Sequence, residues 1–293
     1  MLAAAILLPT LLAAFGLSFL LGDGDDDTAA AEPAGDAEGD AGRDLAGGPG
    51  DNVLSGGAGN DLLQGFGGED FLSGFLGDDT LDGGSGADFL RGGGGNDVLS
   101  GRAENDTMFG GDGDDRMSGD NGADQMDGGA GNDTMEGGAD NDAMDGGFGN
   151  DSVSGGPGND FVRGGAGNDS LIGGDGNDTL EGGAGDDRLV GDNSDVMTGG
   201  ADVDTFVVET TADGSTPLIQ DMDAANETLV INLTLPQAVI DMGATSVSLE
   251  QVPGDSGIFV VANLPDGSEE RVAFLEGILL GTSLDIDLNV TAA

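Results

Sequence analysis

Residues 56–64 read Gly-Gly-Ala-Gly-Asn-Asp-Leu-Leu-Gln, one copy of a unit that repeats sixteen times between Gly47 and Val190 without insertion or deletion. Gly opens every copy, and an apolar residue fills every eighth place. Asp fills the sixth place in fifteen copies, and Asn52 is the exception. Three columns held in phase over 144 residues identify a repeat array.

The order of residue types within the unit predicts its local structure. The first six residues are rich in Gly, Asn and Asp and suit a tight turn with left-handed backbone angles. The last three suit a short strand whose middle side chain points inward. Turn and strand alternate, so two copies would form one coil, and coils would stack about 4.8 Å apart. The array therefore predicts an all-β solenoid of eight coils, about 38 Å long.

The sixth-place aspartates carry the chemistry predicted for this array. Turns alternate between two edges, so aspartates of one edge lie eighteen residues apart in sequence and about 5 Å apart in space, where bare carboxylates repel one another. A hard dication with oxygen ligands relieves this repulsion. Ca²⁺ fits better than Mg²⁺ because it accepts irregular cages of many oxygens, and soft transition metals would require His or Cys. The predicted metal ligands are Asp61, Asp79, Asp97, Asp115, Asp133, Asp151, Asp169 and Asp187 on one edge, Asp70, Asp88, Asp106, Asp124, Asp142, Asp160 and Asp178 on the other, and Asp204 in a later copy.

The unit resembles the RTX (repeats-in-toxin, hemolysin-type) calcium-binding nonapeptide. The resemblance covers about half of the chain, and it implies a parallel β-roll that holds several calcium ions between successive turns of one edge. Some turns depart from the glycine pattern, and bulky side chains resist positive φ, so we expect the calcium sites beside them to be the weaker ones. The departing residues are Phe66, Phe75, Arg102, Asp120, Glu104 and Asp140.

Two segments precede the array. Residues 1–22 contain the uncharged, mostly apolar stretch Leu2 to Leu21, which is long enough to span a bilayer as a helix. A membrane anchor or uncleaved signal competes here with a cleaved signal peptide, which would begin with Lys or Arg. Residues 23–46 are acidic and of low complexity, and predict a disordered linker.

Residues 47–207 are the predicted roll, because a copy one residue short (191–198) and a regular copy (199–207) follow the sixteen. Residues 208–293 are a predicted β-rich cap, with β-branched runs that indicate strands. These runs are Thr228–Leu233, Ser246–Leu249, Ile258–Val261 and Arg271–Leu275. The tail is similar to the segment that closes many RTX proteins and carries an uncleaved type I secretion signal. The resemblance thus implies the type I secretion machinery as a partner.

Composition restricts the function. Fifty-seven acidic and seven basic residues give a net charge of −50, which excludes nucleic acid as a partner and disfavours anionic membranes. Without Lys or His the chain has no P-loop, no zinc-protease helix and no base to activate Ser256. No catalytic residue is predicted. The expectation is a non-enzymatic calcium-binding protein, extracellular, on the cell surface, or anchored in a membrane through residues 2–21. A polysaccharide-active enzyme or its accessory module, and a calcium-dependent adhesin, are the alternatives.

Overall fold

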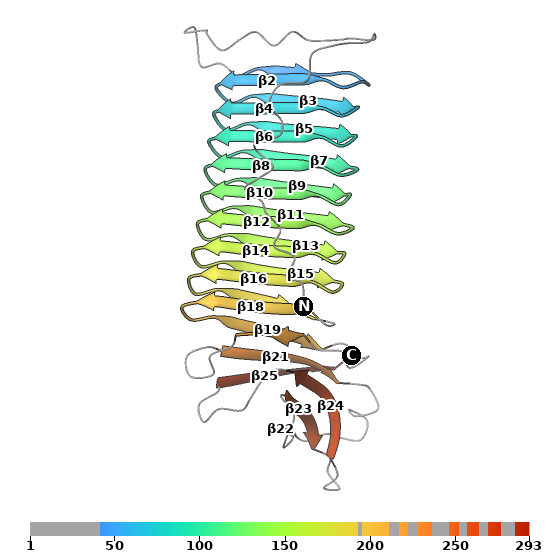
Figure 1. Ribbon diagram of the computed structural model, residues 1–293, viewed down its shortest axis with the longest axis vertical. Coiled ribbons are helices and arrows are strands. Elements are labelled where there is room, and N and C mark those ends of the chain that lie inside the picture. The colour runs from blue at the N-terminus through green and yellow to red at the C-terminus, as the bar shows by residue number, and fades with distance from the viewer. Residues whose placement is uncertain are drawn as a thin grey trace, which may run out of the picture.

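A computed structural model describes residues 42–192, 195–210, 217–221, 228–235, 246–251, 257–263, 269–276 and 285–292. These residues form β-strands and no helix (Figure 1). The apolar segment at residues 2–21, most of the acidic linker and Ser256 lie outside the described residues.

Two long parallel sheets make up the roll, and the chain crosses from one to the other after every strand (Figure 1). Sheet A contains the odd-numbered strands β1 (Asp44–Ala46), β3 (Leu62–Gly67), β5 (Thr80–Ser85), β7 (Val98–Ala103), β9 (Arg116–Asn121), β11 (Thr134–Ala139), β13 (Ser152–Pro157), β15 (Ser170–Asp175), β17 (Arg188–Gly191), β19 (Thr205–Thr210), β21 (Thr228–Leu235) and β25 (Asp285–Ala292). Sheet B contains the even-numbered strands β2 (Val53–Ala58), β4 (Phe71–Leu76), β6 (Phe89–Gly94), β8 (Thr107–Asp112), β10 (Gln125–Ala130), β12 (Ala143–Phe148), β14 (Phe161–Ala166), β16 (Thr179–Ala184), β18 (Val196–Ala201) and β20 (Leu218–Ile219). The fold is the predicted parallel β-roll.

The strands of the roll are longer than the sequence predicted. They run for six residues, as in β2, because the first three residues of the next copy continue the strand. Gly57 and Ala58 still pair with Phe75 and Leu76 of the strand eighteen residues on. The prediction of three-residue strands was therefore wrong, and the turns shrink to the fourth, fifth and sixth places.

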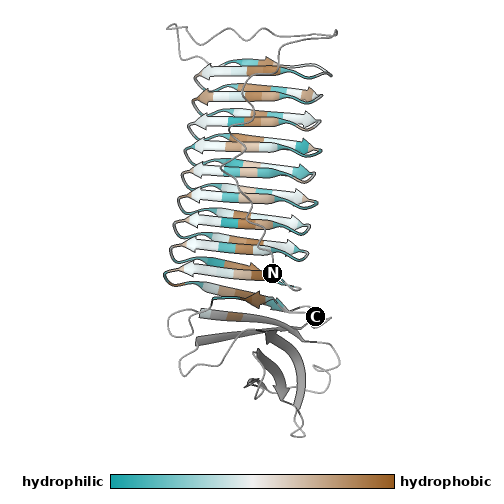
Figure 2. Ribbon diagram, in the orientation of Figure 1, coloured by the Kyte–Doolittle hydropathy of each residue, from teal (hydrophilic) through white to brown (hydrophobic). Residues whose placement is uncertain are grey.

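Eighth-place side chains form the core, as predicted. All sixteen of them, from Leu54 to Leu189, are at most 4% exposed, and each lies in register with its counterpart eighteen residues away. Apolar positions recur in strand after strand of the roll (Figure 2). Each coil contributes only two such side chains, so its burial depends on the coils above and below.

The register changes at the C-terminal end. In the short copy, β17 has four residues instead of six, and the spacing between neighbouring sixth-place aspartates falls to seventeen. Two eight-residue strands, β21 and β25, then extend sheet A. The predicted strands of the tail are present as β21, β22 (Ser246–Gln251), β23 (Gly257–Asn263) and β24 (Glu269–Glu276), and the last three form an antiparallel sheet. The sequence had not singled out β25.

Candidate metal sites at the turns

Each sixth-place aspartate of the roll is buried, with at most 3% of its surface exposed. One carboxylate oxygen, Oδ1, accepts a hydrogen bond from a backbone N–H of the preceding coil, which belongs to Arg43 for Asp61, to Asn52 for Asp70 and to an aspartate for the others. The Asp61 N–H donates to Asp79 Oδ1 at 2.7 Å, and the Asp124 N–H donates to Asp142 Oδ1 at 2.8 Å. These bonds form two ladders along the roll, one on each edge, with the eighteen-residue spacing that the sequence predicted.

The second carboxylate oxygen, Oδ2, is buried and has no hydrogen-bond partner within the described part of the chain. Buried polar atoms in proteins are nearly always paired, so a whole column of such oxygens indicates a ligand of another kind. Sixteen sixth-place aspartates share this feature: Asp61, Asp70, Asp79, Asp88, Asp97, Asp106, Asp115, Asp124, Asp133, Asp142, Asp151, Asp160, Asp169, Asp178, Asp187 and Asp204. They coincide with the predicted ligand set.

The first glycine of each copy has no side chain, so oxygen atoms can approach its Cα closely. A Cβ added to Gly128 would lie 2.5 Å from Asp133 Oδ2 and 2.6 Å from the Gly146 carbonyl oxygen of the next coil. A Cβ at Gly56 would likewise collide with Asp61 Oδ2 and the Gly74 carbonyl. Two oxygens therefore meet beside a bare Cα, and both are of the kind that Ca²⁺ prefers. The described residues contain no group of three or more His, Cys, Asp or Glu side chains that could hold a metal ion.

Burial also makes the charged form of these aspartates costly. It raises the pKa of Asp97, Asp106 and Asp133 from 3.8 to about 7, although the backbone N–H that each one accepts lowers it. Neighbouring carboxylates on the same edge raise the pKa further. Near neutral pH these three sites therefore favour either a proton or a metal cation.

A family described as RTX calcium-binding nonapeptide repeat (4 copies) matches residues 46–81, 73–108, 91–126, 100–135, 118–153, 154–189 and 172–206, which together span more than half of the chain. The chain belongs to this RTX family. RTX nonapeptide repeats are calcium-binding motifs, so membership of this family supports calcium as the bound ion. No curated protein sequence matches the chain. No helix among the described residues is long and apolar enough to cross a membrane.

A second ladder, which the sequence analysis missed, runs through the fifth place of the RTX repeats. The Asp78 N–H donates to Asn60 Oδ1 at 3.0 Å, and the Asn96 N–H donates to Asp78 Oδ1 at 2.9 Å. These side chains reach towards the C-terminal end of the roll, whereas the sixth-place carboxylates reach towards the N-terminal end. The signal was visible as the frequent Asn or Asp before the sixth-place Asp.

The two edges of the roll differ in this second ladder. The B-to-A edge comprises the turns that lead from sheet B to sheet A, and there the ladder is continuous from Asn60 to Val203. The A-to-B edge comprises the other turns, and there Ala87 and Ala123 have no side chain that could accept the next bond. The B-to-A edge is therefore the more regular of the two.

Departures from the glycine pattern do not change the backbone of the turns. Phe66, Arg102 and Asp120 keep positive φ values of 76°, 83° and 71°. Left-handed backbone costs such residues roughly 1–2 kcal/mol each, so the turn is retained under strain. Five of the seven strained residues belong to A-to-B copies, namely Phe66, Arg102, Glu104, Asp120 and Asp140, while Phe75 and Asp202 belong to the B-to-A edge. That the calcium sites beside them are weaker stays a prediction.

The short copy ends one ladder without a free oxygen. Asp195 Oδ1 accepts the Asp178 N–H at 2.8 Å, and Asp195 Oδ2 accepts the Asp192 N–H at 2.7 Å. Asp195 thus satisfies both oxygens within the protein. At the other end, Asn52 replaces the aspartate and its Oδ1 accepts the Gly48 N–H.

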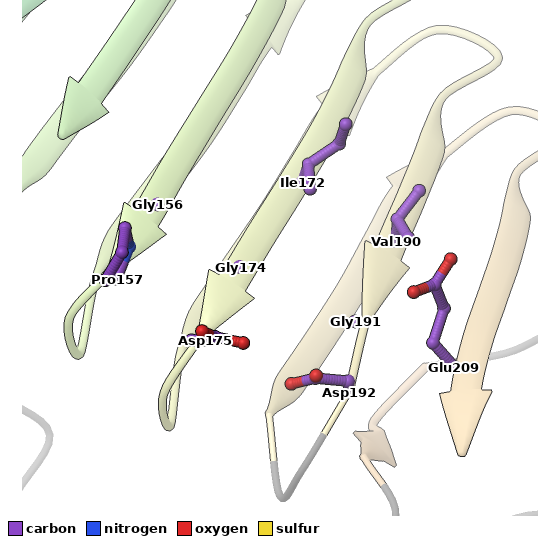
Figure 3. A pocket seen from close by; sticks show the side chains of 9 residues that line it. All are labelled: Gly156, Pro157, Ile172, Gly174, Asp175, Val190, Gly191, Asp192 and Glu209. Carbon is purple, nitrogen blue, oxygen red and sulfur yellow. The ribbon is translucent and has the colours of Figure 1, made fainter. Parts of the chain in front are cut away.

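The early end of β17 leaves a concavity of about 310 Å³ on sheet A (Figure 3). Pro157, Ile172 and Val190 give it an apolar surface, and acidic side chains from successive coils, Asp175 and Glu209 among them, line the rest. It differs from the cradles because its acidic side chains do not come from the sixth place of the repeat.

Proposed function

We propose that this protein is a non-enzymatic calcium-binding protein, exported or displayed at the cell surface, whose roll folds as several calcium ions bind between its turns. The observation that carries the proposal is the column of sixteen buried Oδ2 atoms without a partner in the described residues, each beside the first glycine of its own copy. A chain with a net charge of −50 resists compaction, and this column places some of that charge inside the roll.

The ligands of each ion would be the sixth-place Oδ2 and the carbonyl oxygen of the first glycine in the next coil, as with Asp133 and Gly146. Calcium supplies positive charge where burial penalises the carboxylate, and it links one coil to the next. The protein's own part is to hold Oδ1 on a backbone N–H, which leaves Oδ2 facing the cradle. Because coils gain stability from their neighbours, binding at one cradle favours the next.

Far-ultraviolet circular dichroism during a calcium titration tests this proposal. The chelated chain should give a disordered spectrum at neutral pH. A β signal should then appear cooperatively at about 0.1–1 mM calcium, in the range of extracellular modules. Magnesium at the same concentration is the control and should have little effect, since it demands octahedral geometry. A chelated protein with a full β spectrum and a sharp melting transition would contradict the proposal.

The proposed export rests on the sequence beyond the roll. A type I channel passes unfolded chains, and a roll that needs calcium would stay unfolded in the cytosol, where free calcium lies far below the millimolar range. Deleting residues 243–293 tests whether the tail directs export. Normal amounts of the truncated chain outside the cell would instead favour a route through Leu2 to Leu21.

Incubation of the secreted protein with acidic polysaccharides tests the non-enzymatic assignment, and depolymerisation would overturn it.

A further inference from the structure

Large apolar side chains on the surface gather at the N-terminal end of the roll. Nine are exposed in the described residues, and five of them lie in the first coils of the roll, four on β2 and β4 of sheet B and one on β3 of sheet A. We call these five the N-terminal apolar end: Val53, Phe66, Phe71, Phe75 and Leu76, which are between 43% and 63% exposed. Clustered exposed apolar residues mark an interaction surface more often than scattered ones do.

Packing within the roll does not account for this cluster. Phe71 does stack on Phe89, with ring centroids 5.0 Å apart, but it remains 43% exposed. Phe66 and Phe75 occupy the second place of their copies, where they adopt positive φ values of 76° and 79°. Glycine fills this place in most copies without strain. Two phenylalanines thus occupy a place whose positive φ suits glycine, and both are exposed to solvent. Such exceptions are typical of residues that contact a partner outside the fold.

The segment that precedes the roll indicates what the N-terminal apolar end contacts. The described residues begin at Gly42, and the Leu62 N–H donates to the Arg43 carbonyl, so the preceding segment joins the roll at its N-terminal end. Only residues 22–41 separate it from the apolar stretch Leu2 to Leu21. As the disordered linker that the sequence predicts, a segment of that length would have a mean span of roughly 25 Å. A bilayer that holds Leu2 to Leu21 would therefore lie within reach of the N-terminal apolar end.

Two other occupants fit less well. A stable dimer buries about 800 Å² on each partner, whereas five side chains on three strands offer a few hundred square ångströms. The twenty residues from Leu2 to Leu21 carry more apolar surface than this cluster can cover, so docking them on it would leave most of them in water. A lipid interface accepts both the segment and the cluster, since Phe and Leu enter the boundary between headgroups and acyl chains.

We propose that the N-terminal apolar end inserts into the interfacial region of the bilayer that holds Leu2 to Leu21, so that the roll extends outward from that contact. The inference rests on the membrane attachment suggested for Leu2 to Leu21. Uncharged lipid is the expected surface, because the chain carries a net charge of −50.

Tryptophan fluorescence tests the contact directly, because the chain contains no Trp. Leu76 and Phe148 both end strands of sheet B at the same place of the repeat, and they are 63% and 72% exposed. β4 and β12 are four strands apart in sheet B, about 19 Å. The full-length variants Leu76→Trp and Phe148→Trp, with calcium, are mixed with phosphatidylcholine vesicles that carry a nitroxide on the lipid. We expect at least twofold quenching at position 76 and little at position 148.

Flotation of the same vesicles distinguishes membrane attachment through Leu2 to Leu21 from docking of the N-terminal apolar end. Protein that floats without quenching at position 76 would overturn the docking and leave the attachment standing. Protein that stays in the aqueous phase would overturn both. A blue-shifted but unquenched signal at position 76 would mean that the apolar stretch or a second copy covers the cluster, and would also overturn the docking. Adding Phe75→Gly to Leu76→Trp should reduce the quenching without raising the calcium midpoint, since glycine suits that turn.

Discussion

Replacing Asp133 by asparagine should weaken calcium-driven folding more than the same change at Asp106. Asparagine keeps the Oδ1 that accepts a backbone N–H, at 2.8 Å from Asp115 in Asp133 and at 2.7 Å from Asp88 in Asp106. It turns the free Oδ2 into an amide that carries hydrogens and no charge, so only the metal ligand is lost. Asp133 lies on the regular B-to-A edge. Asp106 lies on the A-to-B edge, in a copy whose Arg102 and Glu104 are already held at positive φ.

The expected magnitude follows from the number of free oxygens. Losing a charged ligand should cost about 2.7 kcal/mol, or a hundredfold in affinity, at the Asp133 site. Strain of roughly 1–2 kcal/mol at Arg102 and again at Glu104 already weakens calcium binding at the Asp106 site. The substitution there should therefore lower the calcium affinity only about tenfold. If one ion per free oxygen binds in a single transition, the Asp133 cost is shared among about sixteen ions and raises the calcium midpoint only about 1.3-fold. If four ions form the cooperative unit, the midpoint rises about threefold.

The assay is the calcium titration by circular dichroism, with wild type, Asp133→Asn and Asp106→Asn measured side by side. The ratio of the two shifts tests turn regularity, and the absolute shift reports the size of the cooperative unit. Equal shifts for the two variants would refute the link between turn geometry and site strength. Unchanged midpoints in both would refute the role of Oδ2 as a calcium ligand.

Three further predictions concern the cradles and the core. Gly128→Ala places a methyl group between Asp133 Oδ2 and the Gly146 carbonyl, so it should raise the calcium midpoint at least as much as Asp133→Asn. Gly94→Ala, whose Cβ would lie 3.5 Å from the nearest atom, should leave the midpoint unchanged. Burial raises the pKa of Asp97 and Asp106 from 3.8 to about 7, so the calcium-free fold binds more protons than the unfolded chain between these values and loses stability as pH rises through them. The chelated protein should therefore show β signal near pH 4 and lose it by pH 8 in circular dichroism. The five core methionines between Met108 and Met144 are at most 4% exposed, so mass spectrometry should find them oxidised by hydrogen peroxide readily with chelator and slowly with calcium.

The repeat spacing predicted which residues stack, because a nine-residue period fixes the order of turns and strands without reference to the rest of the chain. Leu63 and Leu81 accordingly lie one above the other in the core, and Asp61 and Asp79 do so at the edge. The spacing did not predict which atoms face one another. That Asp79 Oδ1 bonds a backbone N–H while Oδ2 stays free depends on where the turn places each amide, and only the folded backbone fixes this.

The same limitation hid the fifth-place ladder and the length of the strands. Asn60 reads as an ordinary turn residue in sequence, since Asn tolerates left-handed angles, and its bond to the next coil appears only when the coils are stacked. Gly57 reads as part of a turn, yet it pairs with Phe75 in the neighbouring strand. Sequence reasoning that assigns each residue to one element underestimates residues that serve both the turn and the sheet.

The opposed directions of the two ladders explain why the coils should form together. The sixth-place carboxylate of one coil receives its hydrogen bond from the coil before it, and the fifth-place side chain receives its own from the coil after it. A coil therefore completes its polar contacts only when both neighbours are in place. At the C-terminal end the A-to-B ladder ends without a free oxygen, because Asp195 accepts two backbone N–H groups, whereas Asp204 on the other edge keeps a free Oδ2. Asp221 accepts the N–H groups of Gly199 and Gly200 at 2.9 Å each. The interior coils have no such substitute for their free Oδ2 atoms in the described structure, so the dependence on calcium lies in the repeated part of the roll.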